Sequence, residues 1–161
     1  MAYDVVIKSV QMQWIASVRE TIASYPAVGP LYGKVAAGLG PAMGQAVLPV
    51  AIWHDREFKE SDVDAEAGFY LREPIPAVEG IQVRQLPSET AASTIHNGSF
   101  RRLPEAYDAL LRWVGSSGYE IAGPIRELYL HCPPPVRQDD ESYVTEIQVP
   151  VKKGPAETRE P

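Results

Sequence analysis

Hydrophobic and polar residues alternate in short segments that occur twice along the chain. The first copy starts at residues 5–10 (VVIKSV) and the second at residues 81–86 (IQVRQL), an offset of 81 − 5 = 76 positions. Alternation with a period of two predicts β-strands. The remaining predicted strands are residues 14–19, 49–54 and 66–71 in the first copy and residues 91–96, 124–130 and 146–151 in the second. The pattern therefore indicates an internal duplication.

A helix is predicted between the second and third strands of each copy. In the second copy, apolar residues recur at i, i+4, i+7, i+8 and i+11, which is the spacing of one helical face. These residues are Leu103, Tyr107, Leu110, Leu111 and Val114. Pro104 suits a first helical turn, as does Pro30 in the first copy. The first helix is predicted to be the weaker one because interior glycines such as Gly33 and Gly38 disfavour helix.

Two β-α-β-β units of this kind predict an α+β fold, with one antiparallel sheet and both helices on one of its faces. We expect a single domain over residues 1–152, made of repeat halves at about 3–73 and 80–152. Residues 153–161 are charged and contain proline, which predicts a disordered tail.

Composition and charge narrow the class of protein. The chain has 161 residues, a net charge of −6 and one cysteine, Cys132. The acidic balance argues against direct nucleic-acid binding, and no apolar run is long enough for a membrane span. The N-terminus lacks the features of a signal peptide, and the single cysteine suits a reducing compartment, so a cytoplasmic protein is expected.

The sequence predicts no metal site and no cofactor. His131 and Cys132 are adjacent, so in an extended chain their side chains point to opposite faces and do not chelate one ion together. No paired-cysteine or HxxxH spacing supports zinc. Phosphate-binding glycine loops and a nucleophile-elbow motif are also missing from the sequence.

Several segments, in order, resemble the GyrI-like small-molecule-binding domain family, which also serves as the effector-binding domain of multidrug-sensing transcription regulators. They are YDV at 3–5, GSF at 98–100, LPEAY at 103–107, GPIRELYL at 123–130 and TEIQVPV at 145–151. The resemblance implies a duplicated β-α-β-β fold with a ligand pocket at the pseudo-two-fold interface of the halves. It also implies lipophilic, often cationic or aromatic ligands and a buried glutamate, whose position is matched by Glu127.

Strand alternation suggests which side chains accompany this glutamate. Glu127 and Tyr129 share one face of their strand, and Leu128 and Leu130 share the other. We expect the leucines to pack against the helices, together with Val50, Ile52 and His54 from the first copy. Ala51 and Trp53 then lie on the face of Glu127 and Tyr129, opposite the helices. Trp53 and Tyr129 would form aromatic walls, and Ala51 would leave space above the carboxylate. Further candidates for the rim of the ligand site are Tyr25, Phe100, Tyr70 and Tyr143.

Two uses of Glu127 follow from this pattern. Desolvation between apolar walls should raise its pKa. A cationic ligand could supply the missing charge and gain cation–π attraction from the rings. Alternatively Glu127 could act as the catalytic general base of a hydrolase, since some family members resemble enzymes that open strained electrophilic rings.

The leading prediction is a stand-alone binding protein that senses or sequesters a small hydrophobic or cationic ligand. Besides the hydrolase, the alternative is an inhibitor that binds a protein partner such as DNA topoisomerase. Both a monomer and a homodimer agree with the sequence.

Overall fold

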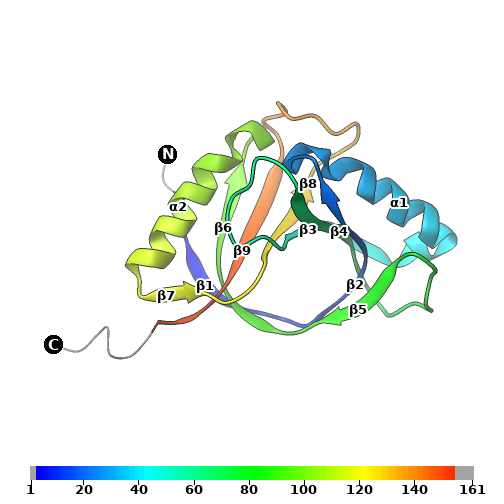
Figure 1. Ribbon diagram of the computed structural model, residues 1–161, viewed down its shortest axis with the longest axis horizontal. Coiled ribbons are helices and arrows are strands. Elements are labelled where there is room, and N and C mark those ends of the chain that lie inside the picture. Colours follow the sequence, from blue (N-terminus) through cyan, green and yellow to red (C-terminus); the bar gives the residue numbers. More distant parts are fainter. Residues whose placement is uncertain (1–2, 155–161) are drawn as a thin grey trace. The chain divides into compact units, whose positions relative to one another are not determined.

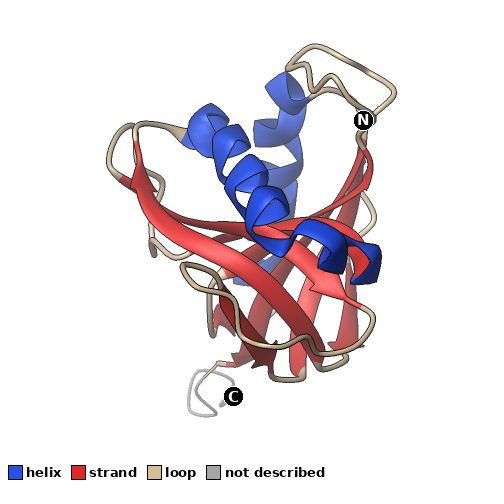
Figure 2. Ribbon diagram, turned by 90° about the vertical axis from the view of Figure 1, so that its right-hand side faces the viewer, coloured by secondary structure: helices blue, strands red, loops and turns tan. Residues whose placement is uncertain are grey.

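The computed structural model describes residues 3–154, in which β-strands are the most abundant regular structure (Figures 1 and 2). Its strands are β1 (Val6–Val10), β2 (Gln13–Ile22), β3 (Ala46–Trp53), β4 (Val63–Leu71), β5 (Gln82–Leu86), β6 (Glu89–Asn97), β7 (Tyr119–Ile121), β8 (Ile125–His131) and β9 (Val144–Lys153). Its two α-helices are α1 (Gly29–Leu39) and α2 (Leu103–Ser116). Within these residues, no helix is both long and apolar enough to cross a bilayer.

The predicted α+β fold with antiparallel strand pairing and two helices is confirmed. All eight predicted strands and both helices are present, and α1 forms despite its glycines. The sequence pattern did not indicate the short strand β7, which pairs with the end of β9. It also did not indicate the 3-10 turns η1 (Tyr25–Val28), η2 (Gly40–Gln45) and η3 (Phe100–Arg102).

The chain divides into two compact units that exchange their first strands. One unit, here called the C-unit, combines residues 1–10 with residues 89–125 and 129–161. The other, the N-unit, consists of residues 11–88 and 126–128. Strand β1 pairs with β6 of the second sequence copy, and β5 pairs with β2 of the first. The compact units therefore differ from the repeat halves 3–73 and 80–152, because alternation reveals a strand but not its partner.

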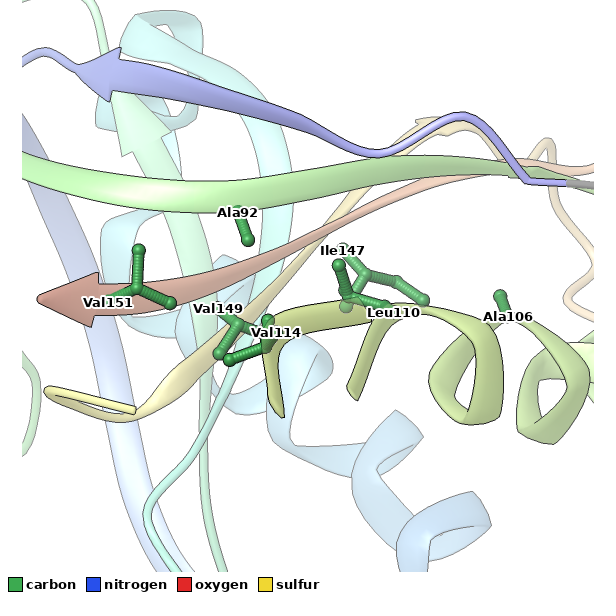
Figure 3. Packing of buried hydrophobic residues seen from close by; sticks show 7 residues of the cluster. All are labelled: Ala92, Ala106, Leu110, Val114, Ile147, Val149 and Val151. Atoms are coloured by element: carbon green, nitrogen blue, oxygen red, sulfur yellow. The ribbon is translucent and has the colours of Figure 1, made fainter. Parts of the chain in front are cut away.

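In the C-unit, β6 lies between β1 and β9, and helix α2 packs against β6 and β9 (Figure 1). Ala106, Leu110 and Val114 of the helix are buried in a cluster with Ala92, Ile147, Val149 and Val151 (Figure 3). The predicted apolar face is correct for Leu110 and Val114. Leu111 is 38% exposed, and Ala106, which the predicted face did not include, is fully buried.

The C-terminal end of β9 lies within the region predicted to be a disordered tail. Lys153 pairs with Tyr119, and the backbone N–H of Gly154 donates to the carbonyl of Gly118 at 2.8 Å. These two residues are therefore ordered, because β7 supplies their hydrogen bonds. Residues 155–161 of the predicted tail lie outside the described part of the chain.

In the N-unit the strand order is β3-β4-β2-β5, and residues 126–128 of β8 lie beside β3. Strands β2 and β4 approach closely at Gly68. A Cβ atom added there would lie 2.7 Å from the Cα of Ser17, nearer than such atoms pack. Glycine is thus required at this crossing because the strand pair leaves no room for a side chain.

Each unit buries one ionised glutamate on the last strand predicted for its copy, residues 66–71 or 146–151. In the N-unit, Glu66 of β4 is completely buried and accepts hydrogen bonds from Ser17 Oγ at 2.5 Å and His54 Nε2 at 2.8 Å. Arg84 of β5 forms an ion pair with the same carboxylate. Burial by itself would raise the pKa of Glu66, but the hydrogen bonds from His54, Arg84 and Ser17 outweigh it and lower the pKa to about 2.

The C-unit repeats this arrangement around Glu146 of β9. Its Oε2 accepts hydrogen bonds from Ser93 Oγ at 2.7 Å, Lys8 Nζ at 2.6 Å and Gln148 Nε2 at 2.9 Å. Burial opposes ionisation here too, and the bonds from Gln148, Lys8 and Ser93 hold the pKa of Glu146 below its usual value. The serines and the basic residues are each 76 positions apart (93 − 17 and 84 − 8). The duplicated acid clusters therefore belong to the framework of the fold.

Replacing Gly68 with alanine is expected to destabilise the protein by about 2 kcal/mol, because the added methyl group overpacks the β2–β4 crossing. The matched control is Gly33→Ala. Gly33 is exposed inside α1 with nothing within 4 Å of an added Cβ, so this change should stabilise the helix by about 1 kcal/mol. Urea unfolding followed by circular dichroism measures both. Equal effects of the two substitutions would contradict the close approach at Gly68.

The stability of the protein should fall in acid as Glu66 becomes protonated. Because its folded pKa is lowered, its contribution is present above the unfolded value of 4.5 and is lost as the pH falls toward about 2. Glu66→Gln should be less stable at pH 7, since Arg84 loses its ionic partner, and its unfolding free energy should change less between pH 4.5 and pH 2. Urea unfolding at several pH values tests this. A variant that keeps the full wild-type pH dependence would show that the Glu66 cluster does not supply it.

Candidate functional site

Glu127 lies on β8 and is 95% buried, with 5% of its surface exposed. Its two neighbours establish its orientation. Arg126 Nη1 lies 3.4 Å from the hydroxyl of Tyr70, and Leu128 belongs to the apolar cluster that contains Ile15, Val50, Ile52, Tyr70 and Leu86. Successive strand residues face opposite ways. Glu127 therefore points away from that cluster, to the other face of the N-unit sheet.

Ala51 and Trp53 of β3 lie on the same face as Glu127. Val50 and Ile52 belong to the apolar cluster, so the residues that alternate with them point away from it. Ala51 is fully buried and Trp53 is 8% exposed. A carboxylate, a small residue and an indole ring thus share one face of neighbouring strands, since β8 lies next to β3.

The predicted orientation of this face relative to the helices is wrong for the N-unit. Phe69 pairs with Pro49 and shares the face of Ala51 and Trp53, and its ring packs on Tyr32 of α1 with centroids 5.8 Å apart. Helix α1 thus covers the face of Glu127, whereas Val50, Ile52 and His54 lie on the other face. Alternation could not distinguish the two faces, because both are apolar and the cluster around Tyr70 is buried without a helical residue.

An aromatic side chain stands against Trp53 on this face. Tyr25, from the turn η1 that precedes α1, meets the indole edge-on with ring centroids 5.1 Å apart and an interplanar angle of 85°. Phe58 packs on the other side of this pair, 5.4 Å from the Tyr25 ring. Edge-to-face contacts at such distances are a favourable aromatic geometry. The N-unit therefore places two predicted site residues, Tyr25 and Trp53, in direct contact.

The C-unit contains the corresponding pair. Phe100, from the turn η3 that precedes α2, meets Tyr129 edge-on with centroids 5.7 Å apart and an angle of 71°. Tyr143 packs on Phe100 at 5.0 Å, is fully buried, and accepts a hydrogen bond from the backbone N–H of Arg137. Tyr143 thus supports Phe100 from within the core.

The structure changes the predicted set of site residues at two positions. Tyr70 shares the face of Glu66 and lies in the apolar cluster, so it does not belong with Glu127 and Trp53. Phe58 was not among the predicted residues, although it is 76% exposed and contacts Tyr25. A single phenylalanine in the polar segment 55–62 was the signal that could have identified it.

Metal-binding and nucleophilic chemistry find little support in these side chains. Within residues 3–154, no three His, Cys, Asp or Glu side chains are grouped so that they could hold a metal ion. His54 donates to the Glu66 carboxylate, and His96 lies between the hydroxyl of Tyr3 and the carbonyl of Ser99. Burial raises the pKa of the Cys132 thiol, which lowers its reactivity.

The side chains on the face of Glu127 are chemically complementary to a positively charged aromatic molecule. A carboxylate in a water-poor setting attracts a cation more strongly than an exposed one. Aromatic rings such as those of Trp53 and Tyr25 attract a cation through their π faces. Ala51 adds a small side chain beside them, so the combination of acid, indole and methyl suits a bulky ligand.

Comparison with solved structures places this fold among known proteins. The C-terminal domain of EcmrR superposes with a TM-score of 0.82 and 25% sequence identity, covering 95% of this chain and 99% of that one. EcmrR in a DNA complex gives a TM-score of 0.83 and 26% identity, and there the match covers 95% of this chain and 59% of the EcmrR chain. No curated protein matches the chain by sequence.

More distant structures share the fold. SAV2435 bound to tetraphenylphosphonium has a TM-score of 0.58 and 14% identity, with 94% of each chain covered. A structure named as a hydrolase from Listeria innocua, encoded by lin2189, has a TM-score of 0.62 and 13% identity over 94% of this chain and 93% of that one. At such identities the likeness concerns the fold alone.

A match to a family model assigns the chain to a protein family. The model of the GyrI-like small molecule binding domain matches residues 34–152, which is 152 − 34 + 1 = 119 of the 161 residues. The match includes β3, β4 and β8, the strands that carry Trp53, Glu66 and Glu127. Together with the superposition on the EcmrR domain, it identifies the protein at the level of family. The chain belongs to the GyrI-like small-molecule-binding domain family.

Proposed function

We propose that the chain binds lipophilic aromatic cations on the helix-covered face of the N-unit, and that this binding serves to sense or sequester toxic compounds. Glu127 supplies the negative charge, Trp53 and Tyr25 supply aromatic contacts, and Ala51 leaves room for the ligand. Phe100 and Tyr129 of the C-unit are proposed as aromatic contacts for ligands of the same class, with Tyr143 holding Phe100 in place.

The observation that carries this proposal is a buried carboxylate on the same face as a contacting pair of aromatic rings. Glu127 is 5% exposed and Trp53 8% exposed, and Tyr25 lies edge-on to the indole. A carboxylate in a water-poor setting attracts a cation more strongly than an exposed one. Each cation–π contact adds about 0.5–2 kcal/mol. Membership of a small-molecule-binding family supports a small ligand, and SAV2435, which shares the fold, is bound to an aromatic cation, tetraphenylphosphonium.

A second carboxylate in the same unit does not compete for this role. The Glu66 carboxylate already accepts hydrogen bonds from Ser17, His54 and Arg84 and lies on the opposite face. Its ion pair with Arg84 supplies the counter-charge that a ligand cation would bring. Glu127, which shares its face with Ala51 and Trp53, is the acid of the N-unit that we assign to ligand binding.

Glu127→Gln should weaken binding of tetraphenylphosphonium by about tenfold or more, because the charge-assisted attraction is lost. Binding of the neutral compound triphenylphosphine oxide should change by less than about twofold. Titration calorimetry measures both ligands. The matched control is Glu105→Gln in the exposed first turn of α2, which changes the net charge equally. Equal weakening by the two substitutions would reduce the effect to net charge and contradict a specific role of Glu127.

Binding should also change the fluorescence of Trp53. The chain has three tryptophans, so Trp14→Phe combined with Trp113→Phe leaves Trp53 as the sole indole fluorophore. Titration of this variant with tetraphenylphosphonium should shift or quench the emission with the dissociation constant found by calorimetry. Emission that stays constant while calorimetry reports binding would place the ligand away from Trp53.

A further inference from the structure

We propose that the indole N–H of Trp53 is a specificity-determining hydrogen-bond donor, so that preferred ligands carry an uncharged acceptor beside their aromatic rings. The acceptor would be a carbonyl oxygen, an ether oxygen or an unprotonated ring nitrogen. This inference rests on the proposed binding site and specifies the chemistry of the ligand that it takes.

The first observation is an unmatched donor. Trp53 is 92% buried, with 8% of its surface exposed, and its Nε1 atom has no hydrogen-bond partner among residues 3–154. Buried tryptophans normally direct this N–H at an acceptor, because an unpaired buried donor loses its bonds to water without compensation. The protein therefore tolerates a cost at Trp53 that a bound acceptor would remove.

The other unmatched buried atoms do not lead to the same conclusion. They are Gln45 Oε1, Thr145 Oγ1 and Gln148 Oε1. Gln148 already donates through its amide nitrogen to Glu146, and its oxygen is left over on a framework residue. A threonine hydroxyl can rotate and can both donate and accept, whereas an indole N–H can only donate. Trp53 is also the one of these four that lies on the face of Glu127.

Tyr25 and Phe58 form an aromatic layer beside the indole of Trp53. The ring of Tyr25 stands against Trp53, and its hydroxyl accepts a hydrogen bond from the backbone N–H of Lys59 at 3.1 Å. Phe58, next to Lys59 in the segment between β3 and β4, packs on Tyr25 yet is 76% exposed. Displacing Tyr25 and Phe58 breaks the hydrogen bond from Lys59 and the ring contacts of Tyr25, and it moves a phenylalanine that is already mostly exposed. A ligand would reach the indole by displacing these two side chains.

A donor at this place selects among ligands that the acid and the rings would treat alike. Cations of equal charge and shape gain the same attraction from Glu127 and the same π contacts. Only a molecule with an acceptor also pairs the Trp53 N–H, and a molecule that presents another donor there leaves both groups unpaired. Sites built to hydrogen-bond a ligand discriminate in this way against analogues that lack the matching group.

Two phosphonium cations of similar shape provide the test. (4-Acetylphenyl)triphenylphosphonium carries a carbonyl acceptor, and (4-isopropylphenyl)triphenylphosphonium is its apolar counterpart. Calorimetry on the wild-type protein should show about fivefold tighter binding of the acetyl compound, the size of one net neutral hydrogen bond. In Trp53→Phe, which keeps a ring and removes the N–H, the two dissociation constants should become equal within about twofold.

A second variant covers the case in which Trp53→Phe disturbs the fold. Site-specific replacement of Trp53 by β-(benzothien-3-yl)alanine exchanges the N–H for sulfur and keeps the bicyclic ring, and it should also abolish the preference. Trp113→Phe, which replaces the indole stacked on Tyr119 in the C-unit by a phenyl ring, should leave the preference intact.

The outcomes separate this inference from the proposed function. Equal affinity of the two cations for the wild-type protein, or a preference that survives both changes at position 53, would overturn the role of the indole donor and leave cation binding standing. Failure of both cations to bind the wild-type protein would overturn the proposed function as well.

Discussion

The framework of this protein depends on one buried, ionised glutamate in each unit. Glu66 and Glu146 each lie on the last strand of a repeat, and each accepts a hydrogen bond from a serine of the neighbouring strand. The counter-charge comes from an exchanged strand: Arg84 of β5 reaches Glu66, and Lys8 of β1 reaches Glu146. A buried carboxylate that lost its partner would be strongly destabilising. The ion pairs therefore fix which edge strand each unit accepts and in which register.

This arrangement places the two buried acids of the N-unit on opposite faces of its sheet. In the N-unit the Glu66 carboxylate is surrounded by protein donors on one face of the sheet, where its low pKa shows that the ionised form is stabilised internally. Glu127 occupies the other face, which it shares with Ala51 and Trp53, under helix α1. Since strand residues alternate between faces, one sheet can carry Glu66 and Glu127 on opposite sides.

Particular residues show which features of the fold and of the candidate site could be predicted from the sequence. Alternation at residues 5–10 and 81–86 located β1 and β5, and the spacing of Leu110 and Val114 located α2. The partners of β1 and β5 could not be predicted from alternation. They depend on the ion pairs of Lys8 with Glu146 and of Arg84 with Glu66, which join residues 138 and 18 positions apart. The face covered by α1 could not be predicted either, since Val50 and Ala51 are both fully buried. The grouping of Glu127 with Ala51 and Trp53 followed from alternation, whereas the place of Phe58 depended on a loop without periodicity.

The duplication makes the differences between the units informative. Tyr25 and Trp53 in one unit correspond to Phe100 and Tyr129 in the other, and both pairs keep the same edge-on geometry. The geometry is therefore a property of the repeated fold, whereas the chemistry of each pair belongs to its side chains. A phenol at position 129 can donate and accept, but an indole at position 53 can only donate. Because the repeated fold holds both pairs of rings in one arrangement, the polar atom on the ring is the feature left to distinguish one ligand from another. For this reason we assign the selectivity of the N-unit to the indole N–H of Trp53.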